Sequence, residues 1–156
     1  GNPCKHTDEL TKKVVMHILR RKPLNPSNLP DTLTEGHSQA VIVQGGTRLL
    51  MSSQVGVDIQ GDLAGPELAE QTEAALDNVE RLLKGLDGDL SRVVMLRIYL
   101  AEYARYDQQV VMEALKHRFP IAPPAATWLI VYGLAEPEWL VAIEAEAVLP
   151  GFVLNS

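Results

Sequence analysis

A helical stripe of apolar side chains in the middle of the chain most constrains the fold, because strand patterns lie on both sides of it. From Pro66 onward, apolar side chains recur every three or four residues, as on one face of an amphipathic helix. Pro66 suits the first turn of a helix, and residues 85–88 contain two glycines that suit its end. The stripe comprises Leu68, Thr72, Ala75, Leu76, Val79, Leu82, Leu83 and Leu86.

Short apolar runs rich in β-branched residues surround this helix and predict strands. Residues 16–22 are strand-like, although 7–20 could also form a short capped helix. Residues 39–44 and 47–53 are two further strands, and Gly45-Gly46 between them predicts a hairpin, since a type I′ turn needs positive φ at both central positions.

The second half of the chain repeats the alternation of strand and helix patterns. Residues 92–100 predict a central strand, and residues 122–134 and 139–149 predict a closing pair of strands. Between them lies a second amphipathic helix, whose inward side chains are Tyr106, Val110, Val111, Ala114 and Leu115. The order β-β-β-α-β-α-β-β predicts an α+β fold with one mixed sheet and two helices on one face.

Two helices cover only one side of such a sheet, so we expect the other face to carry apolar residues such as Trp128 and Tyr132 into solvent. An exposed apolar face of this size predicts an oligomer interface, closed by cyclic symmetry. The length of 156 residues fits one domain. We expect a polar N-terminal extension over residues 1–15, the domain over 16–150 and a tail over 151–156.

Composition excludes several classes of function. A net charge of −6 argues against a nucleic-acid partner, which needs a basic surface. No apolar run approaches the ~20 residues that span a bilayer, so we expect no membrane association and a cytoplasmic protein. The single cysteine, Cys4, excludes an internal disulfide. The histidines show no metal-ligand spacing, and we expect neither metal nor cofactor.

Glu144 is a carboxylate inside an otherwise apolar strand, and the strand before it in the chain offers no cation to pair with it. Burial of an unpaired carboxylate is unfavourable, so Glu144 is a candidate site residue. It could orient a water for hydrolysis, or it could pair with a basic residue across an interface or contact backbone amides. Arg97 could serve as a cation for a ligand, or it could be an exposed or inter-subunit charge.

Four segments together resemble the Rid/YjgF family, which includes enamine/imine deaminases and proteins described as endoribonuclease L-PSP or translation inhibitor. The resemblance covers residues 16–150 and implies a chorismate-mutase-like fold and a homotrimer with clefts between subunits. The segments are the glycine hairpin, Ser52-Ser-Gln-Val-Gly, the helix segment Gln71 to Val79 with Ala75-Leu-Asp-Asn-Val, and the closing Val141-Ala-Ile-Glu-Ala.

The resemblance also implies which residues form the cleft, and one of them departs from the family pattern. Active deaminases carry an arginine after Pro-Ala that holds the substrate carboxylate through two hydrogen bonds, and this position is Ala126 here. The family tyrosine falls on His37, a glycine on Ser53 and a cysteine on Trp128. Glu144 is retained.

The predicted site therefore consists of Glu144 and His37 as candidate catalytic residues and a set of ligand-binding residues. His37 could supply acid–base chemistry, or it could be an ordinary surface histidine. The candidate ligand-binding residues are Ser53, Gln54, Ala126, Thr127 and Trp128.

We expect a homotrimer that binds a small metabolite in its clefts, and the loss of the arginine argues against 2-aminoacrylate deamination. Two alternatives are hydrolysis of a different enamine or imine, with Glu144 orienting water, and ligand sensing without turnover. A ribonuclease activity is disfavoured by the acidic charge and by the absence of a His/Lys/Arg constellation.

Overall fold

The computed structural model describes residues 18–151 and residue 154. The predicted extension over 1–15, the domain start at Met16 and Cys4 lie outside the described residues. So does most of the alternative helix over 7–20. The domain boundaries at residues 16 and 150 therefore stay predictions.

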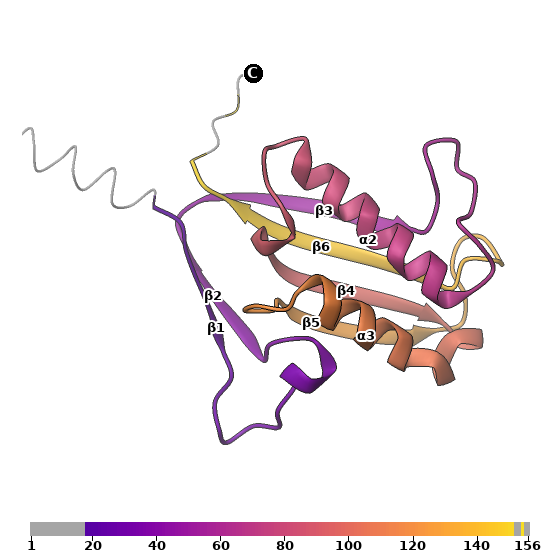
Figure 1. Cartoon of the computed structure of the whole chain (residues 1–156), viewed down its shortest axis with the longest axis horizontal. Helices are drawn as coiled ribbons and strands as arrows, with labels where there is room; N and C mark the ends of the chain where they lie inside the picture. The colour runs from indigo at the N-terminus through magenta and orange to yellow at the C-terminus, as the bar shows by residue number, and fades with distance from the viewer. Residues whose placement is uncertain (1–17, 152–153, 155–156) are drawn as a thin grey trace, which may run out of the picture.

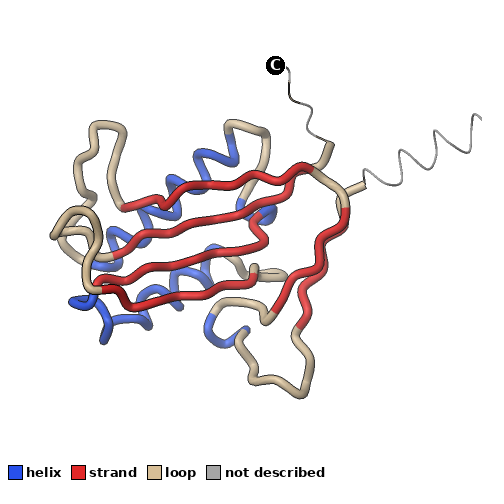
Figure 2. The backbone as a smooth tube through the Cα atoms, turned by 180° about the vertical axis from the view of Figure 1, so that it is seen from behind, coloured by secondary structure: helices blue, strands red, loops and turns tan. Residues whose placement is uncertain are grey.

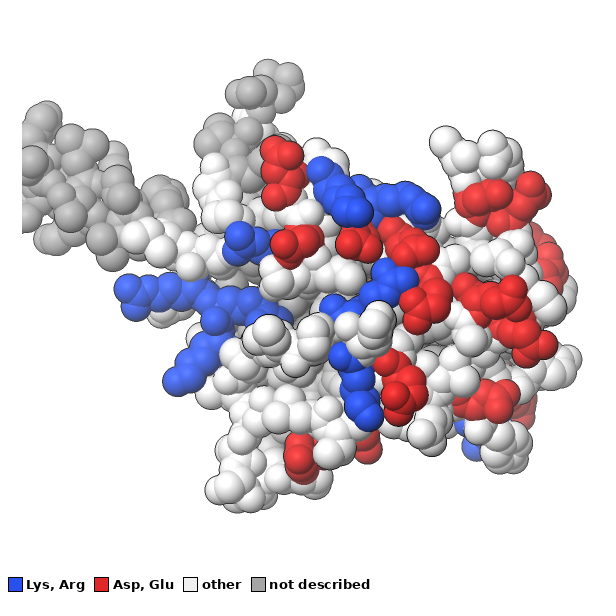
Figure 3. Space-filling view, in the orientation of Figure 1, with Lys and Arg blue, Asp and Glu red and all other residues white. Residues whose placement is uncertain are grey.

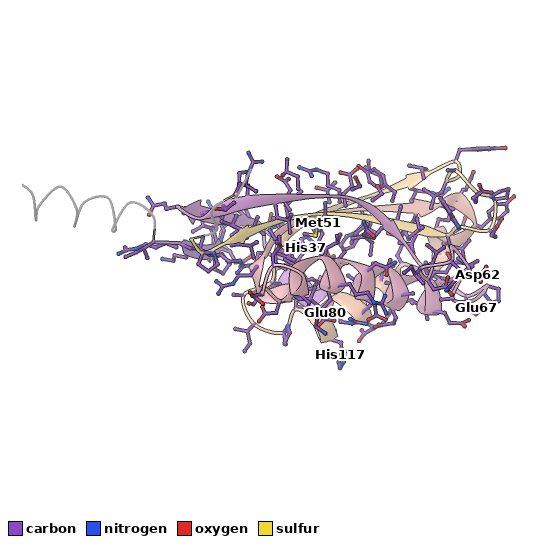
Figure 4. The ribbon with its side chains drawn as sticks, turned by 90° about the horizontal axis from the view of Figure 1, so that it is seen from above. His37, Met51, Asp62, Glu67, Glu80 and His117 are labelled. Carbon is purple, nitrogen blue, oxygen red and sulfur yellow. The ribbon has the colours of Figure 1, made fainter. Side chains whose placement is uncertain are left out.

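Within the described residues, a four-stranded mixed sheet and two α-helices form the body of the molecule (Figure 1). The strand order is β3-β6-β4-β5, with β4 and β5 parallel and the other neighbours antiparallel. Both helices lie on one side of this sheet. The strands lie in front of the helices when the molecule is seen from behind (Figure 2), and the helices lie below the sheet when it is seen from above (Figure 4). The predicted α+β fold is confirmed. The elements are β1 (Arg20–Leu24), β2 (Ala40–Gln44), β3 (Thr47–Val55), α2 (Leu68–Lys84), β4 (Val93–Ala101), α3 (Gln108–Arg118), β5 (Ala125–Val131) and β6 (Val141–Leu149), with 3-10 turns η1 (Leu33–Glu35), η2 (Leu90–Arg92) and η3 (Glu102–Asp107).

The predicted glycine hairpin is wrong, because the strands on either side of Gly45-Gly46 belong to different sheets. β2 pairs with β1 in a two-stranded ribbon, whereas β3 pairs with β6. Both glycines do have positive φ, 71° and 77°. A Cβ on Gly46 would lie 2.5 Å from Val148 Cγ1. The glycine pair thus turns the chain from one sheet to the other against the end of β6.

The β1–β2 ribbon extends away from the four-stranded sheet, and Arg21 ties it to the body of the molecule (Figure 1). Its Nη1 donates to the carbonyl of Ala122 and its Nη2 to the carbonyl of Val93, both at 2.8 Å. One side chain of β1 therefore contacts the segments that begin β4 and precede β5. Observed β1 begins four residues later than the predicted strand over 16–22.

The core lies between α2, α3 and the covered face of the sheet. The predicted stripe of α2 is mostly confirmed, because Leu76, Val79 and Leu83 are fully buried, but Leu82 is 43% exposed. In α3, Val111 and Leu115 are buried as predicted. The prediction for Tyr106 is wrong: it lies in η3, before α3 begins, and is 90% exposed. His117 lies on the outer surface of the helices (Figure 4).

The two helices are also joined through Arg118 near the end of α3. Its guanidinium contacts the carboxylates of Glu73 and Asp77 on α2 at 2.6 and 2.8 Å, and that of Glu80 at 3.4 Å. These contacts raise the pKa of Arg118 against the opposing effect of burial. Charge pairing therefore adds to apolar packing at the helix–helix contact.

Alternation along β5 separates its side chains between the two faces of the sheet. Trp128 is in register with buried Ile98 and packs against the core, so its predicted place on the uncovered face is wrong. The uncovered face instead carries Leu129 and, on β3, Leu50, which are 52% and 64% exposed. Across residues 18–151, no helix is long and apolar enough to cross a membrane.

Candidate functional site

The predicted site residues fall into two hollows. The first, called here the aromatic hollow, has a volume of about 310 Å³ and lies where η1, α3 and β5 meet. The second, the open-face hollow, measures about 570 Å³ and lies between β3 and β6. The aromatic hollow is lined by Glu35, His37, Gln108, Met112, Ala126 and Trp128, and the open-face hollow by Leu50, Met51, Ser52, Ser53 and Glu144.

Trp128 forms a fixed wall of the aromatic hollow. Its indole Nε1 donates to Gln108 Oε1 at 3.0 Å, while Gln108 Nε2 donates to the carbonyl of Arg105 at 2.8 Å. The His37 ring meets the indole edge to face, with 5.2 Å between ring centroids and 73° between planes. Both ends of the Gln108 amide are therefore used to orient Trp128.

The segment that carries His37 is held by close backbone contacts. Gly36 has φ 90°, and a Cβ there would lie 2.9 Å from Leu115 Cβ, so only glycine lets the chain pass this close to α3. Ser38 donates from Oγ to the carbonyl of Pro123 at 2.6 Å and from its backbone N–H to that of Pro124 at 2.9 Å. These contacts fix His37 beside the start of β5.

The environment of His37 favours its neutral form. Burial lowers the pKa of His37, and the nearby Glu35 carboxylate opposes this effect only in part. Its Nδ1 is buried and has no hydrogen-bond partner among the described residues. The hollow therefore presents an uncharged imidazole beside one carboxylate.

Glu144 has partners on the neighbouring strand. The prediction of an unpaired carboxylate, made from the order of strands in the chain, is therefore wrong. Its neighbour in the sheet is β4, and Arg97 of β4 is directly opposite it in register. Arg97 Nη1 lies 3.8 Å from Glu144 Oε2, and Tyr99 Oη donates to Glu144 Oε1 at 2.9 Å. The same hydrogen bond raises the pKa of Tyr99.

A short ladder of charges continues from this pair across the uncovered face. Glu146 accepts hydrogen bonds from Arg48 at 2.9 Å and from Arg97 at 2.8 Å. These bonds lower the pKa of Glu146, with the bond from Arg48 contributing most. Arg97 is therefore shared between two carboxylates rather than free for a ligand.

A break in the β3–β6 ladder presents the serines of the open-face hollow. The register shifts between Met51 and Gln54, so Ser52 and Ser53 are left outside the regular pairing and are exposed. Gln54 does not line the hollow, since its amide donates to the carbonyl of Ser52 at 3.0 Å. The structure thus brings Ser53 together with Glu144, but not Gln54.

The two remaining predicted residues of β5 lie on opposite faces of the sheet. Ala126 lines the aromatic hollow, whereas Thr127 is exposed on the uncovered face in register with Arg97. Sequence reasoning missed Gln108 and Tyr99. The spacing of two residues from Arg97 to Tyr99 could have indicated a shared face, but the partner of Gln108 depends on how α3 packs on β5. Within the described part of the chain, no three His, Cys, Asp or Glu side chains lie together as a metal site would require.

Comparison with known proteins agrees with this fold. Two helices packed on one face of a mixed sheet form the fold that the sequence segments imply. The family model described as endoribonuclease L-PSP matches residues 30–149. The chain therefore belongs to the Rid/YjgF family, as the resemblance predicted.

Three solved structures illustrate the relationship. YyfB of Yersinia pestis, a Rid-family protein of unknown function, is 30% identical, with a TM-score of 0.77 over 83% of this chain and 98% of that one. A putative endoribonuclease from Thermotoga maritima is 28% identical, with a TM-score of 0.61 over 81% of this chain and 92% of that one. A member of the YjgF/YER057c/UK114 family from Mycobacterium tuberculosis is 28% identical, with a TM-score of 0.57 over 83% of this chain and 100% of that one.

Proposed function

We propose that this protein binds a small metabolite in clefts between the copies of a homotrimer. Each cleft would combine the aromatic hollow of one copy with the open-face hollow of another. One observation carries the proposal: residues predicted for a single cleft fall into two hollows of one chain, with Ala126 and Trp128 in one and Ser53 and Glu144 in the other. A site divided in this way becomes whole only when a second copy is present.

The uncovered sheet face supports association of the copies. Leu50 and Leu129 are exposed on it beside the charge ladder of Arg97, Glu144 and Glu146. Exposed apolar residues on one face are typical of an interface. Light scattering is expected to give a trimer mass for the wild-type protein and a smaller mass for Leu50→Glu with unchanged far-ultraviolet circular dichroism. A monomeric wild-type protein at micromolar concentration would contradict the proposal.

The clefts are not expected to process 2-aminoacrylate as arginine-bearing relatives do. Alanine at position 126 offers no hydrogen-bond donor for a substrate carboxylate, and no Lys or Arg of the described residues lines the aromatic hollow. Assay of 2-iminopropionate hydrolysis is expected to show far lower turnover than an arginine-bearing relative. Ala126→Arg is expected to raise it. Equal turnover in the wild-type protein and the relative would overturn this part of the proposal.

A second candidate function is hydrolysis of another imine or enamine. Tyr99 and Arg97 orient the Glu144 carboxyl at a hollow that also holds Ser52 and Ser53, and this arrangement favours it. Glu144 would accept a proton from water as the water oxygen bonds to the imine carbon. The C=N electron pair would move to the nitrogen, which takes up the proton held by Glu144. The hydroxyl of the resulting carbinolamine would then pass its proton through Glu144 to the nitrogen as the C–N bond breaks, so that the amine leaves and a carbonyl product remains.

Glu144→Gln separates catalysis from sensing without turnover. Loss of imine hydrolysis in this variant, with activity kept in the exposed control Glu136→Gln, would support a catalytic carboxyl. A ligand that raises the melting temperature of the wild-type protein and is recovered unchanged would instead support sensing.

The ribonuclease description of the family has little support from the charges of this chain. The net charge is −6, and acidic side chains dominate the end of the molecule away from β1 and β2 (Figure 3). Basic residues gather toward the β1–β2 end, where Arg20 and Lys22 are exposed (Figure 3). If the protein binds no RNA at any salt concentration, a ribonuclease activity is excluded.

A further inference from the structure

We infer that the aromatic hollow selects ligands that are positively charged or neutral and rejects carboxylates. This inference rests on the proposed function, since it assumes that a small molecule enters the hollow. It names the class of that molecule from the residues that line the hollow, and it concerns charge rather than the reaction.

The charge of the residues that line the aromatic hollow disfavours a carboxylate ligand. Glu35 is the one charged side chain among the described residues that line it, and the remainder are an imidazole, an amide, a thioether, a methyl group and an indole. Burial keeps His37 toward its neutral form. A carboxylate entering here would meet another carboxylate, and like charges at close range repel.

The indole of Trp128 favours cationic and neutral ligands. Trp128 is held by Gln108 Oε1 and by the edge-to-face contact with His37, so its ring does not have to be ordered when a ligand binds. A rigid indole face attracts cations through its quadrupole and accepts neutral apolar groups through packing. Trp128 and Glu35 therefore favour the same class of ligand.

The arginines of the charge ladder on the uncovered face do not offset these features. Arg97 and Arg48 both bind Glu146, at 2.8 and 2.9 Å, and Arg97 also faces Glu144. A neighbouring copy that brings this face to the hollow would bring the two carboxylates together with the arginines. The assembled cleft therefore stays without an unpaired guanidinium from this ladder.

The size of the hollow limits the ligand to a small molecule. A volume of about 310 Å³ is at the lower end of the range for small-molecule sites. Cyclohexylammonium, cyclohexanol and cyclohexanecarboxylate share one ring and differ in charge, so they are suitable probes. Their binding to the 156-residue chain would be compared at pH 7 and constant ionic strength.

The indole N–H of Trp128 provides a direct readout by ¹⁵N NMR. The chain contains two tryptophans, Trp128 and Trp139, so two indole signals are expected, and Trp139→Phe assigns them without altering the hollow. Cyclohexylammonium and cyclohexanol are expected to shift the Trp128 signal in a saturable way. Cyclohexanecarboxylate is expected to bind at least ten times more weakly than cyclohexylammonium.

Matched variants test the role of the carboxylate. Glu35→Gln is expected to weaken cyclohexylammonium binding at least threefold and to leave cyclohexanol unchanged, whereas Glu136→Gln, which removes the same charge elsewhere, is expected to change neither. Carboxylate binding as tight as ammonium binding overturns the selectivity and leaves small-molecule binding standing. If no probe shifts the Trp128 signal, the selectivity and ligand entry into this hollow are both overturned.

Discussion

The aromatic hollow is held by backbone contacts between segments far apart in the chain, whereas the open-face hollow is held by side chains on neighbouring strands. Gly36 and Ser38 dock against α3 and the residues before β5, which leaves little freedom to His37 and Trp128. On the other face, Glu144 depends on Tyr99 and Arg97, two long side chains in contact with solvent.

This difference suggests a division of roles between the two hollows. Fixed aromatic walls suit recognition, because no conformational freedom is lost when a ligand binds. An exposed, charge-paired carboxyl on an uncovered sheet suits a group that is completed by another copy. Four predictions test the contrast, beginning with the largest expected effect.

Gly36→Ala is expected to lower the free energy of unfolding by about 3 kcal/mol, because the new methyl group meets Leu115 in a backbone conformation that is already strained for alanine. Gly61→Ala is the matched control: its φ is also positive, 83°, but nothing lies within 4 Å of the added Cβ. We expect about 1 kcal/mol there. Equal losses in urea unfolding would show that close packing at Gly36 does not hold the aromatic hollow.

Ser38→Ala is expected to cost about 1–2 kcal/mol, because the fully buried hydroxyl bonds the carbonyl of Pro123 and that carbonyl would lose its partner. Ser53→Ala in the open-face hollow removes an exposed hydroxyl, and we expect a change within about 0.5 kcal/mol. Chemical denaturation of both variants measures the contrast. A larger loss for Ser53 would reverse the assignment of which hollow is rigid.

Glu146→Gln is expected to remove part of the acid sensitivity of the fold. Its pKa is lowered in the folded state, so its stabilising effect is present above the unfolded pKa of about 4.3 and is lost as pH falls through the lower folded value. The stability difference between wild type and variant should therefore be greatest near neutral pH and should shrink in acid. The control Glu136→Gln should keep the wild-type dependence on pH.

His37 is expected to titrate below the ordinary histidine pKa of about 6.5, because burial disfavours its charged form. Its folded pKa is lower than its unfolded pKa, so stability is lost as pH falls from about 6.5 toward the folded value. NMR titration of the imidazole protons measures this. Glu35→Gln should lower the pKa further, since the Glu35 carboxylate raises it. A pKa at or above 6.5 in the wild-type protein would contradict the neutral form proposed for His37.

Much of the secondary structure could be predicted because local periodicity reports burial. The stripe of α2 follows directly from which side chains are apolar. The Gly45-Gly46 hairpin failed although both glycines have the expected φ, because turn geometry does not specify which strand will pair with the next one. The predicted inward position of Tyr106 was wrong because the helix begins two residues after it.

The candidate site was predicted residue by residue but not as an arrangement. Ser53 and Glu144 line one hollow, and His37, Ala126 and Trp128 line the other. Thr127 lies on the other face from its neighbours, and Gln54 turns to its own strand. Tyr99 was missed because its contact with Glu144 depends on β4 and β6 being neighbours.

The sequence alone determined the class of fold and the family, because hydrophobic period and short motifs are local properties of the chain. It also determined that position 126 offers no cation. Only the tertiary structure decided that Arg97 and Tyr99 contact the Glu144 carboxylate and that Trp128 faces the helices. It also decided that the residues predicted for one cleft are divided between two hollows. The physical reason is that strand order and register, which are set by packing over the whole domain, choose which distant side chains meet.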